Sequence, residues 1–198
     1  MKLEWHKISS TARWLPAYFW QRASRRSATT GPPHLIIALA DHFEPAIIPS
    51  APGKYASRDV QEQRLEEWTC KYPLLIDPWR DDDGRPFVHT YFYPAEQYDR
   101  GLIERLSEHC RAGWGEIEVH LHHGAEIPDT AENTRQTLLK FRDALEGHGC
   151  LSRMDGTGPA RYAFVHGNFS LANSGFGGCG VDNEMQILAD TGCFADFT

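Results

Sequence analysis

The sequence predicts an α/β protein built on a parallel, β/α barrel-like sheet, irregular and incomplete, with a basic and aromatic N-terminal arm. Short segments typical of strands alternate along the chain with amphipathic segments typical of helices. This alternation favours parallel strands joined by right-handed crossovers. The 198 residues, 41% of them hydrophobic, are enough for one domain with a substantial core.

The first strand is expected in the continuous apolar run Leu35–Ala40, which is typical of a strand buried on both faces. Four further strands are expected at Pro86–Tyr93, Glu116–His122, Tyr162–Val165 and Cys193–Phe197. Four helices are expected between them. The first begins at Arg58 with Ser57 as its cap, and the second carries Leu102, Ile103 and Leu106 on one face. The third covers Asp129–Gly149, and the fourth is a short helix capped by Asp182 or Asn183. A closed eight-stranded barrel takes about 250 residues, so we expect this chain to be part of a longer protein.

Charge is distributed unevenly between two expected regions, an arm over residues 1–30 and the sheet domain over 31–198. The arm has six Lys/Arg and one acidic residue, a net charge of +5, whereas the rest has 14 basic and 26 acidic residues, −12. An acidic body argues against nucleic acid as a partner. The basic, tryptophan-containing arm fits either peripheral contact with an anionic membrane surface or a cover for the bottom of the domain. Pro16 interrupts its helical pattern.

The five cysteines are odd in number and scattered, with no CxxC pair. This argues against a disulfide framework and against a cysteine-ligated zinc site, and it fits a reducing compartment. No apolar run approaches the roughly 20 residues of a membrane span, and no signal-peptide pattern is present at the N-terminus. The expected location is therefore the cytoplasm, with or without membrane association.

Histidines gather where the predicted strands end, which is where parallel α/β folds hold their ligands. Five of the ten histidines lie at three such ends, together with Asp41, and they are His42, His120, His122, His123 and His166. A single histidine at such a position is usually a surface or hydrogen-bonded residue. The group as a whole predicts a metal or acid/base site, and imidazole and carboxylate ligands suit Zn²⁺.

The third expected strand allows a closer interpretation. Its side chains alternate, so Glu118, His120 and His122 share one face, opposite an apolar face that would pack under helices. Histidines at i and i+2 lie about 6–7 Å apart along the backbone, so both rings can converge on one ion. His123 lies past the strand and is the alternative to His122 as a ligand.

Other residues near the strand ends have two interpretations each. Asp41 either ligates the metal or takes a proton from water, unless it only caps its loop. Glu44 is a second-choice ligand. His166 either polarises the substrate or protonates a leaving group, unless it only anchors a loop through Asn168. Asp182 and Glu184 look like ordinary helix-start residues. The glycine-rich stretch 175–180 lacks a phosphate-binding motif, and no nucleophile elbow is present.

The order of these parts resembles the polysaccharide deacetylase superfamily, whose members have an irregular β/α barrel. The resemblance covers the chain from about residue 34 onward. It departs from the family pattern at His42, which stands where a second aspartate is usual, and in the spacing of the paired histidines. The residues that carry it are Asp41 with His42, Thr90–Tyr93, His120 with His122 or His123, and Cys193–Asp196, with His166 where the family has an arginine motif.

The resemblance implies a metal-dependent hydrolase that removes acetyl groups from N-acetylated sugars of a polysaccharide or glycolipid. It implies Asp41 as the base, His166 as a second catalytic residue, and a divalent metal, preferably zinc, held by His42, His120 and His122 or His123. Substrate contacts are expected from Phe43, Glu44, Tyr93 and Asn168, with Phe169 as a further ring that sugars can stack on. The alternatives are a barrel hydrolase acting on another ester, amide or phosphoester, and a non-catalytic glycan-binding barrel.

Overall fold

The computed structural model describes residues 5–25, 31–32, 34–51, 53–124, 128–153, 156–175 and 179–198. Contacts divide the chain into two units, Met1–Ile37 and Ala38–Thr198. In the described part of the first unit, helix α1 (Trp5–Ser24) continues through Pro16. Among the described residues, no helix is both long enough and apolar enough to cross a membrane.

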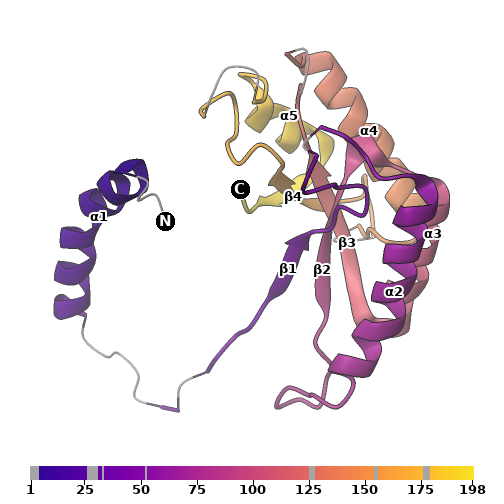
Figure 1. Ribbon diagram of the computed structural model, residues 1–198, viewed down its shortest axis with the longest axis horizontal. Coiled ribbons are helices and arrows are strands. Elements are labelled where there is room, and N and C mark those ends of the chain that lie inside the picture. Colours follow the sequence, from indigo (N-terminus) through magenta and orange to yellow (C-terminus); the bar gives the residue numbers. More distant parts are fainter. Residues whose placement is uncertain are drawn as a thin grey trace. The chain divides into compact units, whose positions relative to one another are not determined.

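The second unit is a five-stranded sheet in which all strand pairs are parallel (Figure 1). The spatial order of the strands is the same as their order in the sequence, so each strand pairs with the one before it. Parallel neighbours need a crossover, and the helices supply it. The strands are β1 (Leu39–His42), β2 (His89–Pro94), β3 (Gly115–Leu121), β4 (Tyr162–His166) and β5 (Cys193–Asp196).

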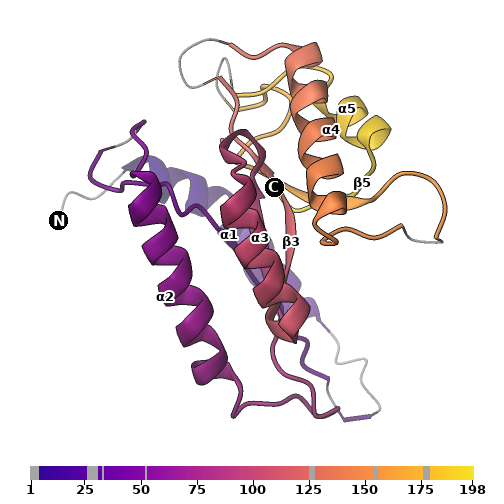
Figure 2. The same ribbon diagram turned by 90° about the vertical axis from the view of Figure 1, so that its right-hand side faces the viewer.

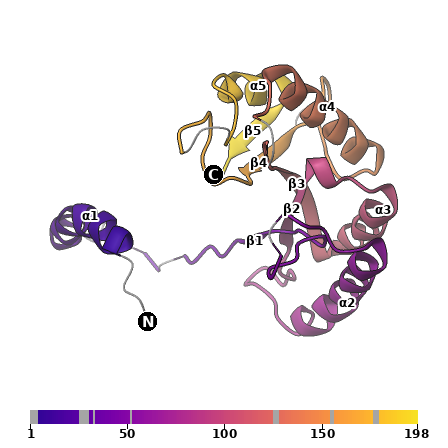
Figure 3. The same cartoon turned by 45° about the horizontal axis from the view of Figure 1, so that its top comes forward.

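Four helices connect the strands, and their apolar residues join one core with the side chains of a single sheet face. Figures 2 and 3 show these helices ranged along that face. Capping fixes two of their starts: Asp99 accepts hydrogen bonds from the first turn of α3, and Thr130 from that of α4. The helices are α2 (Arg58–Ile76), α3 (Arg100–His109), α4 (Ala131–Gly147) and α5 (Glu184–Thr191), with short helical turns at Ala95–Gln97 and Cys110–Trp114.

Alternation along β3 sorts its side chains as the sequence predicts. Ile117, Val119 and Leu121 are buried in the core under the helices. The opposite face of the sheet carries a small separate apolar cluster, which is Phe92, Ala163 and Val165. Glu118 lies on that opposite face, where its carboxylate accepts a hydrogen bond from the backbone N–H of Ala163 at 2.6 Å.

One strand prediction is wrong in its position. Leu35 and Ile36, expected within a doubly buried strand, are 85% and 91% exposed and lie outside β1. The strand begins only at Leu39, because pairing with β2 begins where Leu39 meets His89. The other strands and helices appear where the sequence predicts them, with ends that differ by at most three residues. Helix α2 begins at Arg58 as predicted, although the Ser57 side chain makes no capping bond.

Candidate metal centre

Two clusters of histidine and glutamate at the carboxyl ends of the strands could each hold a metal ion. In each cluster, one ligand atom from every residue lies within 4.8 Å of the others. The Glu44 cluster consists of His42, Glu44 and His120, and His122 borders it. The Glu184 cluster consists of His123, His166 and Glu184.

In the Glu44 cluster, the carboxylate lies among three imidazoles. Its Oε1 is 3.8 Å from His42 Nδ1 and 3.6 Å from His120 Nε2, and its Oε2 is 3.6 Å from His122 Nε2. These distances are too long for hydrogen bonds. They are close to the spacing of about 3.3–3.6 Å between ligand atoms placed tetrahedrally at zinc–ligand distances of about 2.0–2.2 Å.

His120 is oriented as a metal-binding histidine would be. Its side chain is fully buried, and its Nδ1 is 2.8 Å from the carbonyl oxygen of Val165 on the neighbouring strand. A carbonyl oxygen can only accept, so the ring proton lies on Nδ1. The Nε2 lone pair is therefore free, and this buried atom has no hydrogen-bond partner. Burying a nitrogen without a hydrogen-bond partner costs free energy of folding, unless a bound ion or water occupies the space it faces.

His122 is held in the same way by a carboxylate. Its Nδ1 lies 2.7 Å from Glu96 Oε1, just beyond the end of β2, and its backbone N–H also bonds to Glu96. Burial lowers the pKa of His122, but the hydrogen bond and charge of Glu96 outweigh burial and raise it above the ordinary value. A cavity of about 320 Å³ opens beside this pair, lined also by Asp129 and Asn133.

Burial and neighbouring side chains shift the pKa values of Glu44 and His42. Burial opposes ionisation of Glu44, but the neighbouring His120 and His122 outweigh burial and lower the pKa of the carboxyl group. Burial and the nearby His120 together lower the pKa of His42. Metal ligands must be deprotonated to bind, so both shifts favour the protonation states that a cation requires.

In the Glu184 cluster, the ring proton of His166 lies on Nε2, whereas that of His120 lies on Nδ1. Asn168 directs its backbone N–H to His166 Nδ1 at 2.9 Å, so Nδ1 accepts and the ring proton lies on Nε2, which is 3.3 Å from Glu184 Oε1. That Nε2 has no lone pair to offer a cation. His123 contacts a carboxylate through each nitrogen, Asp129 at 2.8 Å and Glu184 at 2.9 Å. The cluster is therefore better described as a buried ion network than as a metal site.

The structure thus separates residues that the sequence grouped together. His42, His120 and His122 lie around Glu44, whereas His123 and His166 lie around Glu184. Asp41 and His42 are adjacent in β1, so their side chains point to opposite faces of the sheet. Asp41 Oδ1 lies 3.2 Å from His89 Nε2, although neither atom has hydrogen-bond geometry.

The residues expected to contact substrate also fall into different places. Phe43 and Tyr93 pack with the core under the helices. Asn168 ties two loops together through His123, whose backbone N–H bonds to its Oδ1 at 2.8 Å. Phe169 is exposed beside His42. Glu96 and Glu184 were not assigned from the sequence: Glu96 stands two residues past the end of β2, and Glu184 looks like a helix-start residue.

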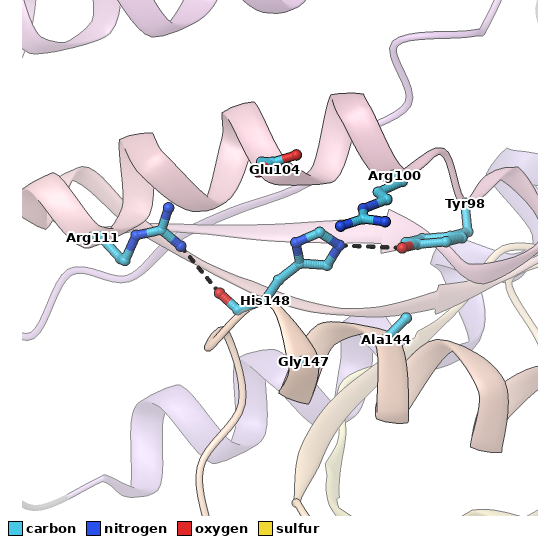
Figure 4. A pocket seen from close by; sticks show the side chains of 7 residues that line it. All are labelled: Tyr98, Arg100, Glu104, Arg111, Ala144, Gly147 and His148. Carbon is cyan, nitrogen blue, oxygen red and sulfur yellow. Dashed lines mark hydrogen bonds between the residues drawn. The ribbon is translucent and has the colours of Figure 1, made fainter.

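A separate surface cavity of about 430 Å³ lies between α3 and α4 (Figure 4). His148 crosses it, with Nε2 3.1 Å from the Tyr98 hydroxyl and its carbonyl accepting from Arg111. This cavity shares no residue with either cluster. The candidate metal ligands therefore lie apart from this cavity, at the ends of the strands.

No family model matches the chain, and no curated protein or solved structure matches it either.

Proposed function

We propose that the chain is a metal-dependent hydrolase that removes acetyl groups from N-acetylated sugars, with its metal in the Glu44 cluster. The observation that carries this proposal is the buried Nε2 of His120. It has no partner, its lone pair is free because Nδ1 donates to Val165, and it faces Glu44 beside the His42 ring. Hydrogen bonding of the second ring nitrogen is the usual way in which a metal-binding histidine is oriented.

The ligand set supports zinc as the ion. His42, Glu44 and His120 supply two imidazoles and one carboxylate, and three protein ligands with one open position are typical of catalytic zinc. A divalent ion held there would polarise a carbonyl oxygen and lower the pKa of a water molecule. Glu44 is thus a ligand in this proposal, which was its second-choice role in the sequence analysis beside that of a substrate contact.

The His122–Glu96 pair is the proposed proton carrier. Its imidazole stands on the other side of Glu44, with Nε2 directed to the cluster and Nδ1 held by Glu96. The ring takes a proton from the attacking water and then gives it to the departing amine. Glu96 stabilises the charged ring between these two steps. Asp41 is not assigned this task, because it lies with His89.

The topology supports a β/α barrel-type scaffold. Strands that follow one another in sequence order, with helices on a single face, match the first part of such a barrel. The Glu44 cluster lies at the carboxyl ends of β1 and β3, where barrel enzymes carry their catalytic residues. The resemblance to polysaccharide deacetylases supports the amide bond of an N-acetylated sugar as the bond that is cleaved.

Elemental analysis of the purified chain, with hydrolysis of an N-acetylglucosamine oligosaccharide, tests this proposal. We expect about one zinc per chain, lost in His120→Ala and in His42→Ala. His148→Ala removes a histidine outside both clusters and serves as the matched control. A chain without metal that also fails to take up zinc on titration would overturn the proposal.

The position of Asp41 favours a second candidate, a hydrolase of the same metal type that cleaves another bond. The resemblance implies an aspartate base at the metal, whereas here the proposed base is a histidine. Parallel assays with a phosphoester and with an N-acetylated oligosaccharide separate the two candidates. Zinc-dependent turnover of the phosphoester alone would favour the second.

A further inference from the structure

Phe169 has an unusual backbone conformation and an unusually exposed side chain. Its φ is +61°, in the left-handed region that residues other than glycine rarely adopt. Its ring is 83% exposed. Such a conformation is strained and persists only where the surroundings impose it. Neither the backbone energy nor core packing therefore explains why a phenylalanine stands here.

The surroundings that impose this conformation belong to the Glu184 cluster. The backbone N–H of Phe169 bonds to the carbonyl of His166 at 3.3 Å. Three residues later, the backbone N–H of Ala172 donates to Glu184 Oε2 at 2.8 Å. Ala172 and Asn173 also have positive φ. The loop that follows β4 is therefore anchored on both sides of Phe169 by fully buried groups.

The anchored loop places the Phe169 ring beside the candidate metal centre. Its ring centroid is 5.9 Å from that of His42, and the two planes are within 18° of parallel. Phe43, by contrast, packs its ring against Trp68 and Tyr91 in the core. Phe169 thus offers a flat apolar surface next to a proposed metal ligand, and the described part of the chain leaves most of that surface uncovered.

We propose that Phe169 is a substrate-recognition residue that stacks on the apolar face of a sugar ring and holds it beside the Glu44 cluster. This inference rests on the proposed function for the identity of the ligand and adds the residue that recognises it. Aromatic stacking is worth about 0.5–1.5 kcal/mol beyond burial, which corresponds to roughly two- to tenfold in affinity.

Binding of tri-N-acetylglucosamine, measured by calorimetry on the full chain, tests the inference. We expect Phe169→Ala to raise the dissociation constant by about twofold to tenfold. We expect Phe169→Tyr, which keeps the ring, to bind as the wild type does. Phe194→Ala is the matched control, because it removes another exposed phenyl ring, 53% exposed, from β5. Metal content, measured on the same samples, should be unchanged in all three variants.

The outcomes separate this inference from the proposed function. Weaker binding in Phe169→Ala, without hydrolysis by any variant or by the wild type, would support the stacking role and contradict the proposed hydrolase activity. Hydrolysis with the same KM in wild type and Phe169→Ala would retain the hydrolase and overturn the stacking role. An equal loss in Phe194→Ala would also overturn it. A wild-type chain that neither binds nor hydrolyses the trisaccharide would overturn both.

Discussion

His120 and His166 lie at the ends of neighbouring strands, yet their Nδ1 atoms have opposite partners. In His120 this nitrogen meets a carbonyl oxygen, and in His166 it meets a backbone N–H. One ring therefore directs a lone pair outward from Nε2, and the other directs a proton. This difference in the position of the ring proton helps to distinguish two clusters of similar composition.

Nitrogen-15 NMR of the metal-free chain should detect the two tautomers directly. We expect neutral His120 to be protonated on Nδ1 and neutral His166 on Nε2, because their fixed partners accept and donate respectively. On addition of zinc, the His120 Nε2 signal should shift while the His166 signals stay in place. The same tautomer in both rings would contradict the assignment of the metal to the Glu44 cluster.

Gly167→Ala should disturb the site without removing any of its polar groups. A Cβ at this position would overlap the ring of His122, so the ring must shift from its place beside Glu44. We expect zinc to remain bound and kcat to fall at least tenfold, because His122 loses its alignment for proton transfer. Gly147→Ala is the control, since a Cβ there meets nothing within 4 Å. Unchanged kcat in Gly167→Ala would remove His122 from the mechanism.

Glu184→Gln should change how stability depends on pH. Burial raises the pKa of Glu184, but the hydrogen bond from His123 and the nearby His166 Nε2, 3.3 Å away, outweigh it and hold the pKa at about 2. The folded pKa is below the unfolded value of 4.5, so this stabilisation is complete above pH 4.5 and is lost as the pH falls towards 2. The pKa of His123 is raised, so its contribution is complete below 6.5 and is lost as the pH rises through that raised pKa.

Urea unfolding at a series of pH values measures this contribution. At pH 6 the variant should be less stable than the wild type by about 3–5 kcal/mol, because a buried ion pair loses one partner. The difference should shrink as the pH falls from 4.5 towards 2. Glu108→Gln, an exposed change on α3, should leave the profile unaltered. Parallel profiles for Glu184→Gln and wild type would show that the cluster contributes no ionic stabilisation.

Glu118→Gln should stabilise the chain at alkaline pH. Burial raises the pKa of Glu118 to about 7, although the N–H of Ala163 opposes this shift. The folded state therefore keeps a proton that the unfolded state releases near pH 4.5, and stability falls as the pH rises from about 4.5 to 7. The amide oxygen of glutamine still accepts from Ala163.

Thermal unfolding at two pH values checks this expectation. The Glu118→Gln variant should have a higher Tm than the wild type at pH 8 and the same Tm at pH 4. Its neighbour on the same face, Glu116, is exposed, so Glu116→Gln serves as the control. A lower Tm in Glu118→Gln at pH 8 would mean that the ionised carboxylate stabilises the fold.

The sequence predicted the parts of the fold that depend on local pattern. The alternation along β3 identified its buried face, and the helix of α2 begins at the residue predicted. The run Leu35–Ala40 was misplaced because apolar composition alone does not fix a strand, whose position depends on its partner. That partner is distant in sequence, and no local signal reports it.

The sequence predicts where the candidate site lies, but not which histidines lie together in it. Histidines at strand ends indicated the edge of the sheet at which the structure places both clusters. Whether His122 or His123 joins His120 depends on how the chain turns after β3, and no periodicity applies there. Glu184 is adjacent to both His123 and His166, yet its place in the first turn of α5 is where acidic residues commonly stand for electrostatic reasons. Sequence alone gives such a residue no distinguishing mark.

The order of the strands also bears on how the chain acquires its structure. Each strand pairs with its predecessor, so a chain emerging from the ribosome can add one strand at a time to an existing edge. The Glu44 cluster needs nothing beyond Val165, whereas the Glu184 cluster waits for α5. During synthesis, the side chains proposed as metal ligands therefore meet before the anchor of the Phe169 loop has been made.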